Sequence, residues 1–269
     1  MKKVSSESNP TIKEYRRLLD GKNRGDNRIA VEGFNLLEEA IKQGFEIETL
    51  FYSSELASRG HLEVLLENVP PGTRKIEVSP TLFKKISQTE TPPGVAAVVE
   101  YPEFTLEQAL DEVSSPAMLA DRLQDPGNLG TIMRSLAAAG GRFLFYRAGT
   151  VNPFNHKVLR SSAGALFHLR LVKCDDLREL LIGLKKKGFL VVSTDLETSS
   201  YYYQVDFNQP FVLITGNERQ GVSREAGESA DISVKIPLAE GVESLNAAVA
   251  TAVILFEARR QELTGSQGK

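Results

Sequence analysis

Residues 211–225 read FVLITGNERQGVSRE, an apolar run that ends in a loop bracketed by Gly216 and Gly221. A continuous apolar run of this kind is typical of a strand buried on both faces of a parallel sheet. The residues after Gly221 predict the start of a helix. A strand, a glycine loop and a helix in this order often bind a nucleotide. The stretch therefore predicts an α/β fold with a candidate ligand loop.

The amino-acid sequence of this loop excludes two phosphate-binding motifs. A P-loop needs a lysine directly after its second glycine, and Val222 stands there instead. A dinucleotide fingerprint needs G-x-G-x-x-G, whereas Asn217 and Glu218 follow Gly216. The Glu218 carboxylate would also repel a pyrophosphate. The loop therefore suits a ligand without phosphates, for example a cationic one, and the alternative is a plain strand-to-helix turn.

The composition excludes several classes of protein. The chain has 269 residues, 41% hydrophobic and 25% charged, as expected for one large or two ordinary globular domains. No apolar run approaches the ~20 residues of a membrane span, and residues 1–10 lack the apolar core of a secretory signal. The single Cys174 cannot form an internal disulfide, which favours a reducing cytoplasm. Cys174 and the scattered His61, His156 and His168 indicate no metal site.

Basic residues are concentrated at the N-terminus although the net charge of the chain is −3. Residues 1–28 contain eight Lys or Arg and four Asp or Glu, a local net charge of eight minus four, or +4. A basic segment can follow a phosphate backbone, and the alternative is a solvated helix face with a tail. The candidate RNA-binding residues are Lys13, Arg16, Arg17, Lys22, Arg24 and Arg28.

The first hundred residues predict a small α/β domain. Apolar spacing and breakers such as Pro92-Pro93-Gly94 set its elements. We expect helices over 11–19, 31–44, 61–69 and 79–88, and strands over 47–53 and 95–101. The segment 101–104 reads as a linker, so the expected domains are residues 1–103 and 104–269.

The second domain alternates strand and helix patterns, which predicts a parallel sheet with helices on both faces. Expected strands are 116–123, 142–146, 189–195, 211–216 and 232–238; expected helices are 105–113, 128–141, 155–166, 175–188 and 244–262. Asn128 is the expected N-cap of its helix, and Gly140 the residue that ends it. Polar loops at 124–128, 215–221 and 238–246 follow strands and should converge at the carboxyl ends of the strands.

Four segments of this domain resemble the SpoU (TrmH) family of RNA 2′-O-ribose methyltransferases. They are DPGNLGTIMRSLAAAG (125–140), NPFNHKVLRSSAGALF (152–167), LITGNERQGVSRE (213–225) and IPLAEGVESLNAAVATAVILFE (236–257). Their order, spacing and spelling agree with the family over roughly residues 116–262. The resemblance implies a deep trefoil knot of the SPOUT type, S-adenosylmethionine as cofactor and a homodimer formed by the knotted domain.

The resemblance also implies a small N-terminal RNA-binding domain of ribosomal-protein type and an RNA substrate. This arrangement favours ribosomal RNA, 23S-type over 16S-type, and transfer RNA is the alternative. A non-catalytic RNA-binding or ribosome-assembly protein that keeps the fold is a second class, and an unrelated α/β nucleotide-binding enzyme a third. Intact Asn128, Arg134, Glu218 and Asn246 argue against loss of activity.

Family roles fall on particular residues of this chain. The resemblance assigns cofactor contacts to Thr215, Gly216, Asn217, Gly221, Ile236, Leu238, Ser244, Leu245 and Asn246, and the catalytic site to Asn128, Arg134, Glu218, Ser244 and Asn246. The family arginine, here Arg134, is often written as a general base. Because a guanidinium stays protonated, a phosphate clamp that stabilises developing negative charge is the easier role. Ile236 and Leu245 have an alternative as core residues, and Ser244 as a helix cap.

Overall fold

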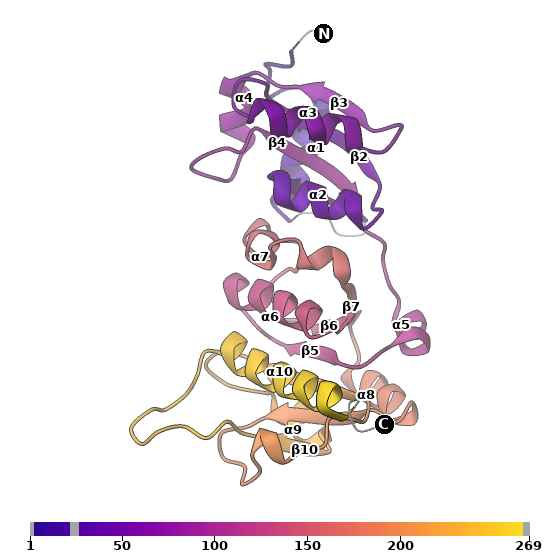
Figure 1. Cartoon of the computed structure of the whole chain (residues 1–269), viewed down its shortest axis with the longest axis vertical. Coiled ribbons are helices and arrows are strands. Elements are labelled where there is room, and N and C mark those ends of the chain that lie inside the picture. Colours follow the sequence, from indigo (N-terminus) through magenta and orange to yellow (C-terminus); the bar gives the residue numbers. More distant parts are fainter. Residues whose placement is uncertain (1–2, 22–26, 266–269) are drawn as a thin grey trace. The chain divides into compact units, whose positions relative to one another are not determined.

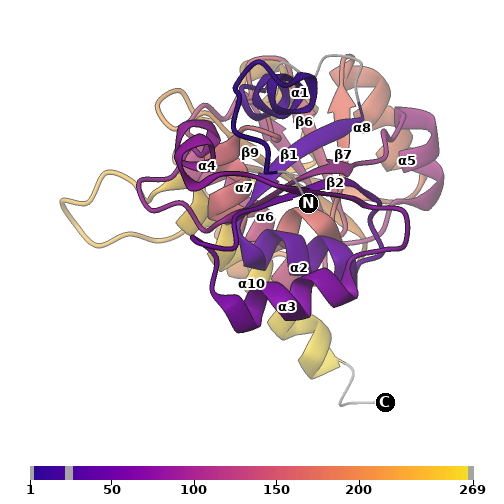
Figure 2. The same ribbon diagram turned by 90° about the horizontal axis from the view of Figure 1, so that it is seen from above.

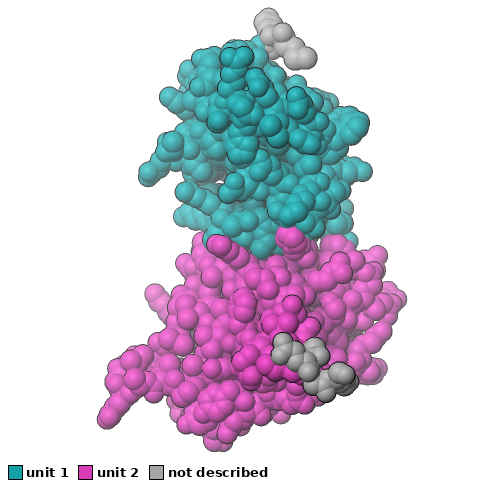
Figure 3. Space-filling model, viewed as in Figure 1, with its two compact units in different colours: residues 1–103, 154–167 teal, residues 104–153, 168–269 magenta. Residues whose placement is uncertain are grey.

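The structure is a computed structural model that describes residues 3–21 and 27–265. Lys22 and Arg24, two of the candidate RNA-binding residues, lie outside the described residues. The chain forms two compact units (Figure 3). Unit 1 contains Met1–Glu103 and Phe154–Phe167, and unit 2 contains Phe104–Pro153 and His168–Lys269.

Unit 1 is a four-stranded sheet with helices on both faces. The strand order is β1 (Arg28–Glu32), β4 (Val95–Glu100), β2 (Ile47–Tyr52), β3 (Arg74–Glu77), and only β2 and β3 are parallel. Figure 2 shows α2 (Phe34–Lys42) beside α3 (Arg59–Asn68). The other face carries α1 (Pro10–Leu19) and α4 (Pro80–Ile86), whose apolar side chains pack with those of the strands. The segment α7 (His156–Ser162) with the short helix Ala165–His168 follows β6 along the chain.

Two sequence predictions for unit 1 are wrong in detail. The helix expected over 31–44 begins at Phe34, because Val31 and Glu32 belong to β1. Gly33 separates the two elements with φ of +100°, a backbone conformation that glycine adopts readily. Strand β3 was not predicted, because its RKIE sequence is exposed or only partly buried and has no apolar run.

Unit 2 contains a six-stranded sheet in the order β10-β8-β9-β5-β6-β7, in which every neighbouring pair is parallel. The strands are β5 (Ala117–Asp121), β6 (Phe143–Arg147), β7 (Arg170–Cys174), β8 (Leu190–Thr194), β9 (Phe211–Gly216) and β10 (Ile232–Val234). The predicted parallel sheet is confirmed. Strand β7 was missed, because Arg170 and Lys173 interrupt a short apolar segment.

Helices cover both faces of this sheet (Figure 1). One face packs against α5 (Leu106–Glu112), α8 (Leu177–Lys186) and α9 (Arg224–Ser229) through one continuous apolar core. The other carries α6 (Pro126–Ala138) and α10 (Ala247–Gly265), which pack on each other. A buried hydrogen bond of 2.8 Å between the Thr215 and Thr251 hydroxyls ties β9 to α10. In the described part of the chain, every helix is too short or too polar to cross a bilayer.

Two helix caps differ from the prediction. The N-cap of α6 is Asp125, whose carboxylate accepts from the Asn128 backbone N–H at 2.7 Å, and Pro126 occupies the first turn. The side chain of Asn128 is therefore free for other contacts. At α10, Asn246 caps the helix in place of Ser244, because its Oδ1 accepts from the backbone N–H groups of Ala248 (2.9 Å) and Val249 (3.2 Å). The predicted end of α6 at Gly140 is confirmed by its φ of +91°.

Candidate active site

The glycine loop after β9 is closed by its own backbone. Asn217 and Gly221 exchange two backbone hydrogen bonds of 2.9 Å. A Cβ on Gly216 would lie 2.1 Å from the Gly221 carbonyl carbon, so only glycine fits there. The Asn217 side chain accepts from the N–H groups of Arg219 and Gln220. Asn217 therefore shapes the loop from within.

Glu218 joins this loop to the start of α6. Its carboxylate accepts from the backbone N–H groups of Gln124 (3.2 Å) and Asp125 (3.1 Å) and from Asn128 Nδ2 (3.1 Å). Partial burial raises the pKa of Glu218, whereas the hydrogen bonds from Asn128 and the backbone lower it. The hydrogen bonds have the larger effect, so the pKa lies below the ordinary 4.5. The carboxylate is therefore ionised and fully engaged at neutral pH.

The third polar loop closes the arrangement through Asn246. Its Nδ2 donates to Asn128 Oδ1 at 2.8 Å, so Asn246, Asn128 and Glu218 form one chain of hydrogen bonds. These residues come from the N-terminus of α10, the first turn of α6 and the loop after β9. The predicted convergence of the three loops is thus observed.

Two cavities meet at these loops. The first, of about 620 Å³, is lined by every predicted cofactor residue except Asn246. The second, of about 470 Å³, is lined by Asp125, Asn128, Glu218, Ser244, Leu245, Asn246 and Ala247. Four residues line both cavities: Glu218, Ser244, Leu245 and Ala247. A group bound in the first cavity can therefore reach one bound in the second.

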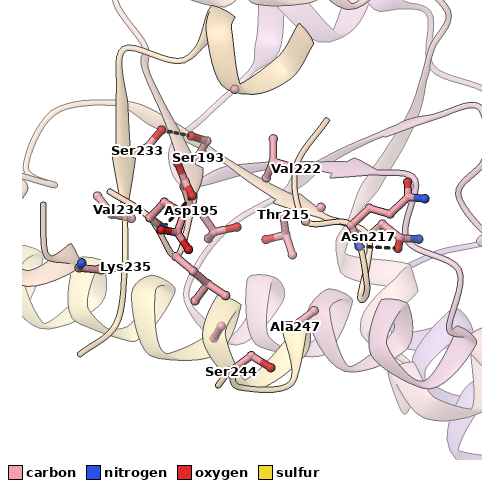
Figure 4. Close-up of a pocket in the computed structure, with 18 of the residues that line it drawn as sticks. Ser193, Asp195, Thr215, Asn217, Val222, Ser233, Val234, Lys235, Ser244 and Ala247 are labelled. Carbon is pink, nitrogen blue, oxygen red and sulfur yellow. Dashed lines mark hydrogen bonds between the residues drawn. The ribbon is translucent and has the colours of Figure 1, made fainter. Parts of the chain in front are cut away.

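The first cavity has the size and lining that a nucleoside ligand needs. Small-molecule sites usually measure 300–1,000 Å³ and combine apolar walls with a few polar groups. Here Ile236, Leu238 and Leu245 supply apolar wall, while Thr215 and Asn217 supply polar groups on the β9 side (Figure 4). S-adenosylmethionine fits this donor set, since it combines a purine, a ribose and a charged tail.

Arg134 stands apart from both cavities. It lies on the exposed face of α6 and lines neither of them. Among residues 3–21 and 27–265, no side chain or backbone group forms a hydrogen bond or ion pair with its guanidinium. Its five donors are therefore available to an external anion.

Part of the cavity wall was not predicted from the sequence. The first cavity is also lined by residues 193–197, which end β8 and form the turn after it, and by residues 233–235, which end β10 and follow it. The available signal was the polar ending of FLVVSTD, a strand whose carboxyl end lies beside that of β9 in the sheet. Its place in the strand order was not evident from the sequence.

A buried ion pair behind the glycine loop was also missed. Asp121, fully buried at the end of β5, accepts from Arg147 Nη1 (3.0 Å) and from the Ser223 backbone N–H (2.6 Å). Arg147 also bonds Glu225 at 2.8 Å. Burial lowers the pKa of Arg147, but Glu225 and Asp121 raise it more, so the net shift is upward. The pair anchors the end of the loop to strands β5 and β6.

The described basic residues of the N-terminal segment are largely paired with carboxylates. Arg16 pairs with Glu7 at 2.9 Å, while Arg17 and Arg28 both pair with Glu14. Lys13 is exposed on α1. These pairs lie near the surface and are individually weak, so an RNA phosphate could compete for the arginines.

Comparison with known proteins places the chain in a family. Residues 116–256 match the SpoU rRNA Methylase family, and residues 9–97 match the MRM3-like substrate binding domain. The chain belongs to the SpoU rRNA methylase family. The family predicted from the four sequence segments is confirmed.

Individual relatives cover nearly the whole chain. The 23S rRNA (guanosine(2553)-2′-O)-methyltransferase RlmP of Bacillus subtilis (strain 168) is 34% identical over 96% of this chain and 100% of its own length. The 23S rRNA (uridine(2479)-2′-O)-methyltransferase of Streptomyces viridochromogenes is 31% identical over 96% of this chain and 92% of its own length. The SpoU methyltransferase AviRb from the same organism, solved with the cofactor AdoMet, superposes with a TM-score of 0.85 at 30% identity, covering 95% of this chain and 99% of AviRb.

Proposed function

We propose that the protein transfers a methyl group from S-adenosylmethionine to the ribose 2′-hydroxyl of a nucleotide in ribosomal RNA of the 23S type. The observation that carries this proposal is the junction of two cavities at Glu218, Ser244 and Leu245. The first cavity takes the cofactor. The second, beside Asn128 and Asn246, takes the target ribose. Full-length relatives named as 23S rRNA 2′-O-methyltransferases support this choice of substrate.

The first cavity binds the cofactor through the loops after β9 and β10. Thr215, Gly216, Asn217 and Gly221 form the β9 side, and Ile236, Leu238, Ser244 and Leu245 the opposite side. When bound, S-adenosylmethionine supplies a methyl group on a positively charged sulfur. The Glu218 carboxylate and the Ser244 side chain stand where the two cavities meet. Anionic charge at this junction favours a cationic ligand over its neutral product.

The polar chain of Asn246, Asn128 and Glu218 orients the target ribose. Because Asn128 accepts from Asn246 and donates to Glu218, its amide is held in one orientation. Arg134 has no hydrogen-bond or ion-pair partner among the described residues, so its guanidinium can clamp a phosphate of the target nucleotide. Once it is held by that phosphate, the guanidinium also stabilises negative charge that develops on the 2′-oxygen during attack.

The N-terminal residues 1–103 serve as the RNA substrate-binding domain in this proposal. The match of residues 9–97 to a substrate binding domain supports it. The exposed Lys13 and the surface arginines Arg16, Arg17 and Arg28 are the described candidates for phosphate contacts. A reducing, cytoplasmic location fits the single Cys174, which is buried and unpaired.

The methyltransferase unit is proposed to form a trefoil knot and a homodimer. Support for the knot is the packing of α10 on α6, with Asn246 bonded to Asn128 and Asn128 to Glu218 of the glycine loop. Support for the dimer is an apolar stripe on α10: Val249, Phe256 and Leu263 recur every seven residues and are 50%, 48% and 52% exposed. In light scattering, wild type should measure as a dimer and Phe256→Glu as a monomer. An experimental structure traced through residues 216–246 tests the threading.

The test of function is transfer of labelled methyl from S-adenosylmethionine to unmodified transcripts of 23S rRNA, 16S rRNA and transfer RNA. We expect label in 23S rRNA alone, at one site that resists alkaline cleavage. Label confined to transfer RNA would establish the tRNA methyltransferase alternative. Cofactor binding without label in any transcript or in ribosomal particles would favour the non-catalytic RNA-binding alternative.

A further inference from the structure

The turn that follows β8 places a carboxylate on the wall of the cofactor cavity. The backbone N–H of Asp195 donates to the Val234 carbonyl at 3.0 Å, which ties the turn to β10. Its Oδ1 accepts from the Glu197 N–H at 3.0 Å. This local bond fixes the carboxylate before any ligand arrives and leaves Oδ2 for an outside donor.

The position of Asp195 follows from the strand order. Strand β8 lies between β10 and β9, so its carboxyl end opens beside the end of β9. Figure 4 shows Asp195 on the wall with Ser193 and Val234, across the cavity from Asn217. Ligands of open parallel sheets bind along this edge, where the carboxyl ends of the strands meet.

The Asp195 carboxylate places a negative charge on the cavity wall. In the part of the chain that the structure describes, no cation pairs with it. Three cationic residues among those described line the same cavity, and none of them forms an ion pair with Asp195: Arg224 pairs with Glu228 at 2.6 Å, Lys235 lies 5.7 Å from the centre of the Tyr201 ring, and Arg219 is bonded through its backbone N–H to Asn217. A carboxylate on a cavity wall that has a backbone donor on one oxygen and no cationic partner is suited to ligand hydroxyl or ammonium donors.

The two ends of the cavity differ. Asp195 lines the first cavity and not the second, so it lies away from the junction where the methyl group must be presented. Its neighbour Leu196 lines the same wall and is 55% exposed, and Ile236 and Leu238 add apolar surface to the cavity. An apolar wall beside a carboxylate fits a purine with its ribose better than it fits a charged amino-acid tail.

We propose that Asp195 binds the ribose of the cofactor, its free carboxylate oxygen accepting a hydrogen bond from the vicinal 2′- and 3′-hydroxyls. The inference rests on the proposed function, because it assumes that a nucleoside cofactor occupies the first cavity. An acidic side chain that follows a strand and accepts from ribose hydroxyls is a solution that dinucleotide-binding sheets also use. Asp195 thereby selects a nucleoside with both hydroxyls present.

The test is calorimetric binding of S-adenosylhomocysteine, compared with an analogue that lacks both ribose hydroxyls. Asp195→Ala should weaken binding of S-adenosylhomocysteine about 10-fold, because a charged hydrogen bond is lost. Wild type and Asp195→Ala should bind the deoxy analogue equally. Asp195→Asn retains an acceptor for the Glu197 N–H, so it should keep the turn and show an intermediate affinity. Glu179→Gln, on the exposed face of α8, is the matched control and should bind as wild type.

The outcomes separate this inference from the function on which it rests. If Asp195→Ala binds S-adenosylhomocysteine as tightly as wild type, the ribose contact is overturned and the function stands. Equal weakening for both ligands would also overturn it, because the carboxylate would then act on another part of the cofactor. If wild type binds neither ligand, the proposed function fails together with the ribose contact.

Discussion

Asn246 donates its side-chain amide to Oδ1 of Asn128 at 2.8 Å, across 118 positions of sequence. The same side chain caps α10 through its own Oδ1, so one residue both begins a helix and orients the polar site. Asn128 in turn donates a hydrogen bond from its Nδ2 to Glu218 Oε1 at 3.1 Å. If the Asn128 amide were flipped, its Nδ2 would face the Asn246 Nδ2 donor and its Oδ1 would face the Glu218 carboxylate, so both hydrogen bonds would be lost. The three side chains therefore hold one arrangement together.

Asn246→Asp separates the two roles of this residue. Aspartate caps helices as well as asparagine, so the bonds to the N–H groups of Ala248 and Val249 remain and stability should change little. The donor to Asn128 is lost, and two oxygen atoms face each other instead. Methyl transfer should fall at least 10-fold while the melting temperature stays near that of wild type.

Asn246→Ala is the comparison, because it removes the cap as well as the donor. It should lower the free energy of unfolding by about 1 kcal/mol in addition to its loss of activity. Full methyl transfer by Asn246→Asp would show that the bond between Asn246 and Asn128 has no part in turnover.

Arg134→Ala tests the proposed phosphate clamp. Because the exposed Arg134 has no partner among the described residues, its removal should change the free energy of unfolding by no more than about 0.5 kcal/mol. Cofactor affinity should be unchanged, because Arg134 does not line the first cavity. The rate of methyl transfer should fall about 10²–10³-fold, as for loss of one donor to a developing oxyanion.

The conservative variant Arg134→Lys distinguishes a charge from a planar fork. Lysine retains the positive charge but cannot make two parallel bonds to a phosphate, so partial activity is expected. Single-turnover rates with a saturating cofactor measure the difference. Wild-type turnover in Arg134→Ala would remove this arginine from the mechanism.

The sheet and the meeting of the loops could be predicted because they follow from local patterns. Buried strands such as 211–216 are continuous apolar runs, and the rule that loops converge at the carboxyl ends of strands needs no tertiary detail. The predictions failed where two local solutions compete. Asp125 and Asn128 are both good helix caps, and the Pro126 between them was the signal that the helix starts earlier.

Long-range pairs were beyond the sequence for a different reason. Asp121 and Arg147 lie 26 positions apart on neighbouring strands, and the sequence around either residue does not indicate that the other is its partner. Asp195 was passed over because its role depends on β8 lying between β9 and β10, which is set by the strand order. Such contacts follow from topology, whereas helix and strand patterns are read over a few residues.

Glu218→Gln gives a pH-dependent change in stability. The pKa of Glu218 is lower in the folded protein than its ordinary value of 4.5, so folding favours the ionised carboxylate. That contribution is present above the unfolded pKa and is lost as the pH falls through the lower folded pKa. Wild type should therefore be more stable than Glu218→Gln at pH 7, and the difference should shrink below about pH 4.5.

Urea denaturation at pH 7, 5, 4 and 3 measures this difference. Glu179→Gln, at an exposed site on α8, is the control and should differ from wild type by a small amount at every pH. A difference that stays constant or grows towards pH 3 would contradict the assignment of an ionised, hydrogen-bonded Glu218.

Arg147→Met tests whether the buried ion pair supports the glycine loop. The variant keeps much of the side-chain volume, but it leaves the fully buried Asp121 with the Ser223 N–H and the more distant Arg122 Nε, at 3.6 Å, as its remaining described partners. Breaking a buried pair costs about 3–5 kcal/mol, and since Arg147 is 21% exposed we expect about 2–3 kcal/mol. Cofactor affinity should fall as well, because the end of the loop is anchored through this pair. Adding Asp121→Asn removes a buried charge that Arg122 alone compensates only at 3.6 Å, and it should restore part of the stability. The control Arg178→Ala, at an exposed site on α8, should cost no more than about 0.5 kcal/mol. If Arg147→Met unfolds at the wild-type urea concentration, Asp121 is satisfied without its partner, and the loop owes its position to the bonds of Asn217 and Glu218 alone.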